Sequence, residues 1–221
     1  MHAAYFDMDG TLLKGDSNDF LTQYLLRRGV IDKSFLDPLH DFHLRYVQGQ
    51  LAIEDFVYYI IKPFIGMEAT TRDELIDGCL HEGGLLAALR PGGLREIARQ
   101  KRNAGIPMIV SSTIDCLIKP IARALKIDYV AAAPLEYDAQ GRITGKLAGK
   151  VPYQRQKVER IEELLAQAKL SNRDSCAYGD SINDYEMLCY AAHSFVIKPS
   201  EALMKQPLSG RFQPLNWDVT L

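Results

Sequence analysis

The sequence predicts an α/β protein whose three-layer core surrounds a parallel sheet and is interrupted by an all-helical insertion. Beyond Pro91, short apolar runs alternate with helix-like segments, which is the pattern of parallel strands joined by crossover helices. Before that point, residues 17–84 carry apolar side chains at helical spacing and give no strand signal. These two observations indicate a sheet-forming core and a separate helical insertion.

The first expected element is a short buried strand over residues 1–9, which contains the apolar run Ala3 to Phe6. Several helices follow, and the last of them is expected to begin at Thr70-Thr71, with a threonine cap and early acids. Glycine and proline interrupt helices, so they mark the expected breaks. These breaks fall at Gly29, Gly49, Pro63 and Gly66.

The remaining elements alternate between helix and strand. Residues 135–145 predict a hairpin, because Gly141 supplies a turn between two extended runs. A strand is expected to lead into Asp180. The other expected elements are helices near 93–104, 115–125 and 155–169, and strands at 106–110, 129–133 and 194–197.

The composition excludes several classes of protein. With 221 residues, of which 47% are hydrophobic, the chain can bury one core and a sizeable insertion. A net charge of −2 provides no basic surface for a phosphate backbone, so we expect no nucleic acid partner. No basic leader and no long unbroken apolar run occur, so we expect no membrane partner and a cytoplasmic location. The four cysteines are widely scattered, which favours free thiols over a zinc or disulfide framework.

Two acidic segments follow apolar runs. In Asp7-Met8-Asp9-Gly10-Thr11, the two carboxylates stand two residues apart and project to the same side of a strand. Their mutual repulsion would raise one pKa unless a positive group offsets it, and a divalent metal would do so. The second segment, Gly179-Asp180-Ser181-Ile182-Asn183-Asp184, follows Cys176-Ala177-Tyr178.

These two segments resemble motifs one and four of the haloacid dehalogenase-like phosphatases, and the resemblance extends through most of the chain. It implies a Rossmann-like core formed by residues 1–14 and 85–221, with residues 15–84 as a helical cap. It also implies that Asp7 attacks phosphorus to give an aspartyl-phosphate, which water then hydrolyses. Asp9 would donate a proton to the leaving alcohol and later accept one from that water.

The resemblance further implies a Mg²⁺ ion. Its ligands would be the Asp7 carboxylate, the main-chain carbonyl of Asp9 and Asp180, with Asp184 completing the site directly or through water. Oxygen ligands suit this hard cation. Asn183 would be a polar organiser of the site.

The second and third motifs leave alternatives open. Ser111 matches the serine of the second motif, whose hydroxyl and neighbouring amides bind phosphoryl oxygens, although Ser112 or Thr113 would fit one register step away. Lys157 is the better match for the lysine of the third motif, and Lys150 is its rival. The residues expected to contribute to substrate binding are Thr11, Asp16, Ser112 and Asn183.

The resemblance is strongest to the subfamily that includes the phosphoserine phosphatases. Asp16 stands where those enzymes carry a glutamate that holds the substrate amine, although an aspartate that caps a helix explains it equally well. Those enzymes also place a carboxylate-binding arginine in the cap, after a segment that resembles Gly49 to Glu54. No arginine stands there in this chain, and only Arg45 could substitute from a neighbouring turn.

The function we expect is therefore a Mg²⁺-dependent phosphomonoester hydrolase that acts on a small phosphorylated metabolite. A phosphotransferase that uses the same intermediate and a phosphoserine phosphatase proper are the nearest alternatives. A non-catalytic phosphate-binding module is the alternative from a different class. The sequence does not indicate an oligomeric state.

Overall fold

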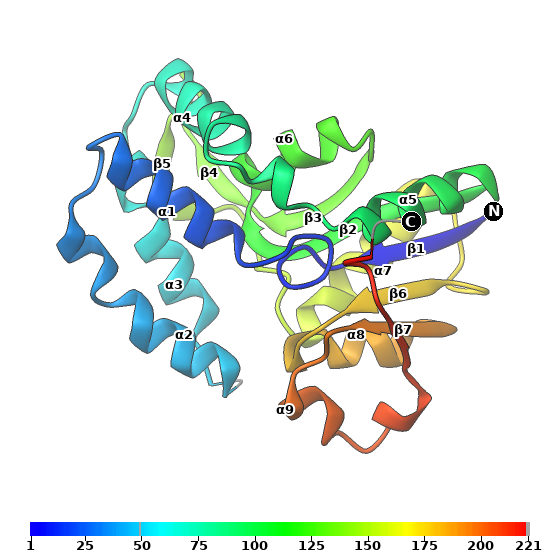
Figure 1. Cartoon of the computed structure of the whole chain (residues 1–221). Coiled ribbons are helices and arrows are strands. Elements are labelled where there is room, and N and C mark those ends of the chain that lie inside the picture. Colours follow the sequence, from blue (N-terminus) through cyan, green and yellow to red (C-terminus); the bar gives the residue numbers. More distant parts are fainter. Residues whose placement is uncertain (49, 220–221) are drawn as a thin grey trace.

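A six-stranded parallel sheet forms the centre of the molecule (Figure 1). The computed structural model of the protein describes residues 1–48 and 50–219, so the predicted break at Gly49 lies outside the described residues. The strand order is β3-β2-β1-β6-β7-β8. The strands are β1 (His2–Phe6), β2 (Gly105–Ile114), β3 (Tyr129–Ala133), β6 (Cys176–Gly179), β7 (His193–Ile197) and β8 (Gln213–Leu215).

Helices cover both faces of this sheet, which confirms the predicted three-layer α/β core. Alternate side chains of β1 point to opposite faces, so that Phe6 packs in one apolar cluster and Tyr5 in the other. The Phe6 cluster includes side chains of α5 (Pro91–Arg102) and α6 (Asp115–Ala124). The Tyr5 cluster includes side chains of α7 (Arg155–Ala168) and α8 (Tyr185–Tyr190), and a short helix α9 (Glu201–Met204) follows.

The segment between β1 and α5 is helical, as its periodicity predicts. It contains α1 (Ser17–Arg27), α2 (Leu39–Val47), α3 (Ile53–Ile60) and α4 (Ala69–His81), which we call the helical segment. In Figure 1 these helices lie to one side of the sheet. Chain breaks fall at Gly29, Pro63 and Gly66, as predicted.

The predicted threonine cap of α4 is wrong. The helix begins at Ala69, its N-cap is Glu68, and no side chain caps it by a hydrogen bond. Gly66 N donates to Ile143 O at 2.9 Å and ties the preceding turn to a neighbouring hairpin. The chain enters the helix soon after it leaves that turn, which places both threonines within the first helical turn.

The hairpin is formed by β4 (Leu135–Tyr137) and β5 (Ile143–Leu147), which pair antiparallel as predicted. Gly141 has a positive φ of 75° in the connecting turn, a conformation that glycine adopts without strain. Besides the bond from Gly66, Arg72 of α4 donates to Gly141 O at 2.6 Å. The hairpin therefore extends from the sheet-forming part and is hydrogen-bonded to α4 and to the turn that precedes α4.

The chain leaves and rejoins the sheet-forming part at one place. Leu13 pairs with Leu89 in an antiparallel bridge. Lys14 N donates to Ala88 O at 2.9 Å, and Arg90 N donates to Leu12 O at 2.8 Å. The two connections of the helical segment therefore lie side by side.

Strand β8 was not predicted from the sequence. It has three residues, lies at the sheet edge and contains Pro214, which lacks the backbone donor of a central strand. Such a short edge strand carries almost no periodic signal.

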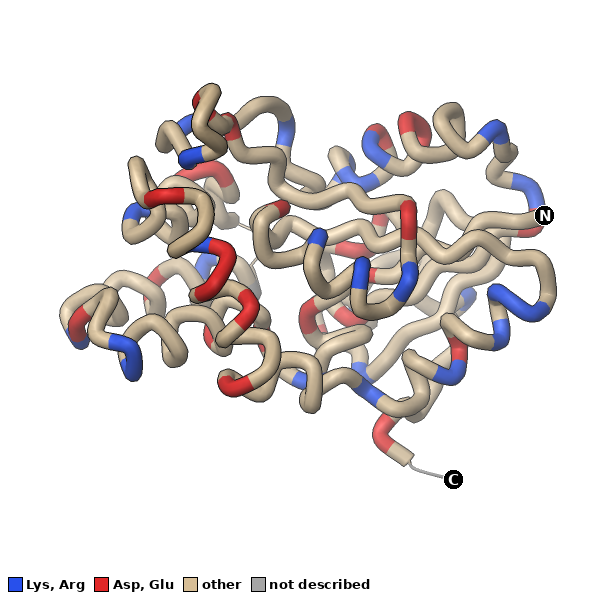
Figure 2. The backbone as a smooth tube through the Cα atoms, turned by 90° about the horizontal axis from the view of Figure 1, so that it is seen from above, with Lys and Arg blue, Asp and Glu red and all other residues tan. Residues whose placement is uncertain are grey.

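Figure 2 shows Lys and Arg interspersed with Asp and Glu over both the sheet-forming part and the helical segment. Across residues 1–48 and 50–219, no helix has the length and apolar character that a bilayer crossing requires. The cytoplasmic location and the absence of a nucleic acid partner stay predictions. All four cysteines are free thiols, of which Cys79 and Cys176 are buried.

Candidate active site

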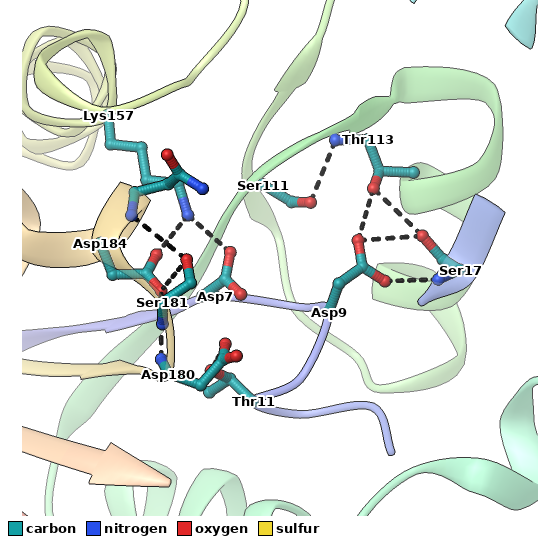
Figure 3. A network of polar contacts seen from close by, with 11 residues as sticks. Asp7, Asp9, Thr11, Ser17, Ser111, Thr113, Lys157, Asp180, Ser181 and Asp184 are labelled. Atoms are coloured by element: carbon teal, nitrogen blue, oxygen red, sulfur yellow. Dashed lines mark hydrogen bonds and ion pairs between the residues drawn. The ribbon is translucent and has the colours of Figure 1, made fainter. Parts of the chain in front are cut away.

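Three carboxylates from two distant segments of the chain meet at the carboxyl edge of the sheet (Figure 3). Asp7 directly follows β1, Asp180 directly follows β6, and Asp184 ends a short 3-10 turn. One oxygen of each carboxylate lies within 4.8 Å of an oxygen of the other two. The chain order reverses between β1 and β6, and such a switch point is where open α/β sheets collect ligands. We call these residues the acidic cluster.

Lys157 lies inside the acidic cluster. Its Nζ is 2.6 Å from Asp7 Oδ1 and 2.5 Å from Asp184 Oδ1, and its side chain is buried. Burial alone would lower the pKa of Lys157, but the charges of Asp184 and Asp7 outweigh burial and raise it. Lys150, the rival in the sequence, instead donates to Glu159 at 2.9 Å on the exposed side of the protein.

The acidic cluster carries more negative charge than Lys157 offsets. Burial, followed by the charge of Asp184, raises the pKa of Asp7 well above its usual range. The same two causes, together with Asp7, raise the pKa of Asp180. An added cation would relieve this repulsion, and three carboxylates form the hard oxygen donor set that Mg²⁺ prefers. The cluster therefore fits the implied metal.

The backbone next to the acidic cluster leaves space for its carboxylates and donates hydrogen bonds to them. Gly10 has a φ of +77°, and a Cβ at this position would lie 2.2 Å from Asp180 Oδ2. Asp184 Oδ2 accepts hydrogen bonds from Asp180 N at 3.1 Å and from Ser181 N at 3.0 Å, which fixes its orientation. Thr11 Oγ1 donates to Asp180 Oδ1 at 2.9 Å. Thr11 thus supports a carboxylate of the cluster in this structure.

Asp9 faces a different set of partners. Its carboxylate accepts hydrogen bonds from Ser17 N at 2.6 Å, Ser17 Oγ at 3.1 Å and Thr113 Oγ1 at 2.7 Å. Burial and the charge of Asp16 raise the pKa of Asp9 to about 7, although these hydrogen bonds oppose the shift. A carboxyl group with this pKa exchanges a proton readily near neutral pH.

The serines that follow Val110 do not stand just after a strand end, as the predicted strand at 106–110 would place them. Strand β2 continues past Val110 to Ile114 with a shift of register, so Ser111 lies within the strand. Ser111 is buried, and its Oγ accepts from Thr113 N at 3.1 Å. Ser112 lines a neighbouring pocket.

Asn183 is buried beside the acidic cluster. Its Oδ1 accepts from Gln154 Nε2 at 3.4 Å. Its Nδ2 has no hydrogen-bond partner among the described residues. A buried amide donor without a partner is costly, and an acceptor such as a phosphoryl oxygen would satisfy it.

A pocket with a cavity volume of about 60 Å³ lies between Asp9 and the helical segment, and we call it the side pocket. Among the described residues that line it, the ionisable ones are three aspartates and His43, with no Lys or Arg. An aromatic and aliphatic wall from the helical segment completes it. The lining residues are Asp9, Asp16, Asn18, Asp19, Leu39, Phe42, His43, Tyr46, Leu51, Ile53, Phe56, Ile60 and Ser112.

Asp16 caps a helix, as one of its two interpretations predicts, and its contact with a substrate amine stays a prediction. Asp16 is the N-cap of α1, where its Oδ1 accepts from Asn18 N at 2.8 Å, and it also lines the side pocket. Arg45 does not line this pocket. Its Nη2 pairs with Asp41 at 2.8 Å, and 57% of its side chain is exposed.

Sequence reasoning missed three residues of this region. Ser17 and Thr113 hold Asp9, and Tyr46 lines the side pocket. Thr113 stood in the sequence only as a register alternative to Ser111. Ser17 and Tyr46 looked like ordinary positions of amphipathic helices, so no local signal marked them.

Comparison with known proteins decides the family. Residues 4–188 match the haloacid dehalogenase-like hydrolase family. The chain belongs to this family. This membership confirms the recognition made from the two acidic segments and supports the assignment of the chain as a phosphatase.

Curated relatives of this hydrolase cover most of its length. A histidinol-phosphatase of Neisseria meningitidis serogroup C is 25% identical over 97% of this chain and 98% of its own. Protein CicA of Caulobacter vibrioides is 35% identical over 84% of this chain and 81% of its own.

Solved structures share the fold. A protein of unknown function from Bordetella pertussis Tohama I aligns with a TM-score of 0.84 at 24% identity and covers 97% of this chain and 98% of its own. A substrate-bound phosphoserine phosphatase aligns with a TM-score of 0.67 at 19% identity and covers 92% of this chain and 89% of its own.

Proposed function

We propose that this hydrolase is a Mg²⁺-dependent phosphomonoesterase that cleaves a small phosphorylated metabolite through an aspartyl-phosphate on Asp7. The observation that carries the proposal is that two neighbouring acids lie in different surroundings. Asp7 lies beside Lys157 in the acidic cluster, whereas Asp9 faces the side pocket. A nucleophile and a proton donor for the leaving group require such an arrangement.

The phosphoryl group would lie against Asp7. Mg²⁺ held by the carboxylates of Asp7, Asp180 and Asp184 and the Asp9 carbonyl would neutralise the charge of the phosphoryl oxygens. An Asp7 oxygen forms a bond to phosphorus while the bond from phosphorus to the ester oxygen breaks. Asp9 gives its proton to that oxygen, and the alcohol leaves through the side pocket.

The second half of the reaction regenerates the enzyme. Asp9, now ionised, accepts a proton from a water molecule as that water attacks phosphorus. Phosphate leaves and Asp7 is restored as a carboxylate. Lys157 holds Asp7 in place throughout and offsets charge on the phosphoryl oxygens, because its Nζ lies 2.6 Å from Asp7 Oδ1.

Hydrogen-bond donors around the phosphoryl position are available from several elements. Ser111 of β2 and the unpartnered Asn183 Nδ2 would bind phosphoryl oxygens. Ser112 would contact the ester, since it lines the side pocket. Thr11 would act through Asp180, to which it donates at 2.9 Å.

We assign residues 1–14 and 85–221 to the catalytic core and residues 15–84 to a cap. The paired connections at Leu13 and Leu89 support this boundary, because both chain crossings lie at one hinge-like site. A cap in this place covers the leaving group and excludes water during phosphoryl transfer.

The charges of the side pocket support a leaving group that carries a cation and no carboxylate. Asp16 and Asp19 would attract an amine, whereas a carboxylate would meet no Lys or Arg among the described lining residues. The pocket therefore disfavours free phosphoserine. Histidinol phosphate is the first candidate, because it is cationic and because a relative is named as a histidinol-phosphatase.

A substrate screen tests this proposal. We would compare kcat/KM for histidinol phosphate, phosphoethanolamine, phosphocholine, glycerol phosphates and phosphoserine at matched pH and Mg²⁺. The amine esters without a carboxylate should exceed phosphoserine by about tenfold or more, since an unpaired carboxylate costs well over 1 kcal/mol. A tenfold preference for phosphoserine would contradict the proposed substrate class, and loss of that preference in Arg45→Ala would identify the residue responsible.

Two controls separate the alternatives for the reaction itself. Product analysis with added acceptor alcohols distinguishes hydrolysis from phosphotransfer, because only a phosphotransferase forms a new ester in preference to phosphate. A protein that fails to hydrolyse p-nitrophenyl phosphate with Mg²⁺ and fails to bind beryllium fluoride would be a non-catalytic module.

A further inference from the structure

The turn that leads into α7 has a backbone conformation that suits glycine, yet glycine is absent from it. Tyr153 O accepts from Gln156 N at 3.0 Å, so residues 153–156 form a β-turn. Gln154 is the first central residue of this turn, with φ 49° and ψ −122°. These angles are close to those of a type II′ turn, in which the first central residue is ordinarily glycine. A glutamine therefore occupies a position that a Cβ atom disfavours.

This turn fixes the start of the helix that carries Lys157. Lys157 N donates to Gln154 O at 3.0 Å, and the Lys157 side chain reaches Asp7 and Asp184 in the acidic cluster. Glycine would form the same turn without strain. A strained residue persists where the surrounding structure holds it, and such residues gather at functional sites. The strain at Gln154 thus points to a use of its side chain.

The side chain of Gln154 contacts the segment that carries the fourth motif. Its Nε2 donates to Asn183 Oδ1 at 3.4 Å. Asn183 stands between Asp180 and Asp184 in the chain, and only 1% of it is exposed. An asparagine amide has an acceptor on one arm and a donor group on the other. Because Oδ1 faces Gln154, the donor arm is Nδ2, which has no hydrogen-bond partner within residues 1–48 and 50–219.

We propose that Gln154 is a positioning residue that orients the Asn183 amide, so that Nδ2 faces the phosphoryl group. The inference rests on the proposed phosphatase function. A flipped Asn183 would set its Nδ2 against the Nε2 donor of Gln154 and would turn Oδ1 toward an anionic phosphoryl oxygen. Both contacts are repulsive, so the glutamine selects the amide orientation that donates to the substrate. Glycine at this position would relax the turn but would leave Asn183 without this donor.

Stability should depend on the backbone of Gln154. Gln154→Ala removes the amide and keeps a Cβ atom in the strained turn, whereas Gln154→Gly removes both. With EDTA present, the Tm of Gln154→Gly should exceed that of Gln154→Ala by about 2–4 °C, because glycine relieves the strain of the positive φ. Equal Tm values would refute the strain on which the inference depends.

Activity should depend on the amide of Gln154, so both variants should lose it to the same extent. We expect kcat for p-nitrophenyl phosphate to fall and the dissociation constant of beryllium fluoride to rise, each by roughly three- to tenfold. The rise in Tm that Mg²⁺ produces should match that of the wild type, because the carboxylates are unchanged. Wild-type kcat and beryllium fluoride affinity in Gln154→Ala would overturn the inference, and so would a lost response to Mg²⁺.

A double-mutant cycle tests whether Gln154 acts through Asn183. Asn183→Ala should itself lower kcat and beryllium fluoride affinity, and Gln154→Ala added to it should cause no further loss. Losses that multiply independently would show that Gln154 acts by another route and would overturn the inference.

The matched control is Lys169→Gly at the other end of α7. Lys169 is the C-cap of this helix, has a φ of 55° and has an exposed side chain. The substitution should raise Tm, as relief of a positive φ does, and should keep kcat within about twofold. A fall in kcat equal to that of Gln154→Gly would attribute the losses to the backbone of α7 and not to the Gln154 amide.

The same measurements separate this inference from the proposed function. If the wild type hydrolyses p-nitrophenyl phosphate and Gln154→Ala does so equally well, only the role of Gln154 is refuted. A wild-type protein that neither hydrolyses this ester nor binds beryllium fluoride refutes both.

Discussion

Asp7 and Asp9 are separated by one residue, yet their carboxylates belong to two different hydrogen-bond networks. Asp7 Oδ1 accepts from Lys157 at 2.6 Å, whereas Asp9 accepts from Ser17 N at 2.6 Å and Thr113 Oγ1 at 2.7 Å. In Figure 3 the network of Asp7 and Lys157 lies on the left, and the network of Asp9, Ser17 and Thr113 lies on the right. Strand β1 ends at Phe6, so the chain beyond it turns and the two acids diverge.

Asp7→Asn should abolish turnover without loss of the fold. An amide cannot form the acyl-phosphate, so kcat should fall on the order of 10³-fold or more. The steady-state rate with p-nitrophenyl phosphate measures this effect, in protein that mass spectrometry shows to be free of deamidation. Asp138→Asn on the hairpin is the matched control and should keep full activity. Substantial turnover by purified Asp7→Asn would remove Asp7 as the nucleophile.

The pKa of Asp9, raised to about 7 by burial and by Asp16, predicts a pH dependence that varies with the leaving group. The first step needs protonated Asp9, so kcat/KM for alkyl phosphate esters should fall as pH rises through about 7. p-Nitrophenolate leaves without a proton, so kcat/KM for p-nitrophenyl phosphate should decline less over the same range. Asp9→Asn should remove the difference between these pH profiles. Identical profiles for both esters in the wild type would argue against Asp9 as the proton donor.

Lys157→Met should be far more disruptive than Lys150→Met. Lys157 is buried between Asp7 and Asp184, and removal of one partner from a buried ion pair costs about 3–5 kcal/mol. Lys150 forms an exposed pair with Glu159, and such a pair contributes about 0–1 kcal/mol. Urea unfolding at pH 8 measures the stability difference, and kcat should fall only in Lys157→Met. A fall in kcat confined to Lys150→Met would instead favour Lys150 as the third-motif lysine.

Asp180→Asn should stabilise the metal-free protein and abolish its response to Mg²⁺. Burial and the charges of Asp184 and Asp7 raise the pKa of Asp180, so its ionised form destabilises the fold. This cost is absent below the unfolded-state pKa of about 3.9 and grows as pH rises toward the raised folded-state value. With EDTA, the variant should therefore gain in Tm over the wild type at pH 8 and gain nothing near pH 4.

Added Mg²⁺ should give the wild type a higher Tm than Asp180→Asn. Ligand that binds only the folded state stabilises it by mass action, so Mg²⁺ should raise the Tm of the wild type and leave Asp180→Asn nearly unchanged. Glu159→Gln, which alters an exposed acid beside Lys150, is the control and should respond like the wild type. A variant that responds fully to Mg²⁺ would show that Asp180 is not a ligand.

The sequence by itself determined the architecture and the chemical identity of the acidic cluster. Short apolar runs, helical runs of period 3.6 and turn glycines are local properties, so β1, the helices and the hairpin at Gly141 could be predicted from neighbouring residues alone. The rule that parallel strands join through crossover helices then brings Asp7 and Asp180 to one edge.

Only the tertiary structure decided which side chains contact Asp7 and which contact Asp9. Lys157 and Lys150 both stand near the start of one helix, and the direction of α7 over the sheet places the first in the cluster and the second in solvent. Thr113 reaches Asp9 because β2 shifts register after Val110. The ring of Tyr46 lies 6.0 Å from the ring of Tyr153, because α2 packs against the core. These contacts join residues far apart in the chain, and their geometry depends on packing that no local pattern records.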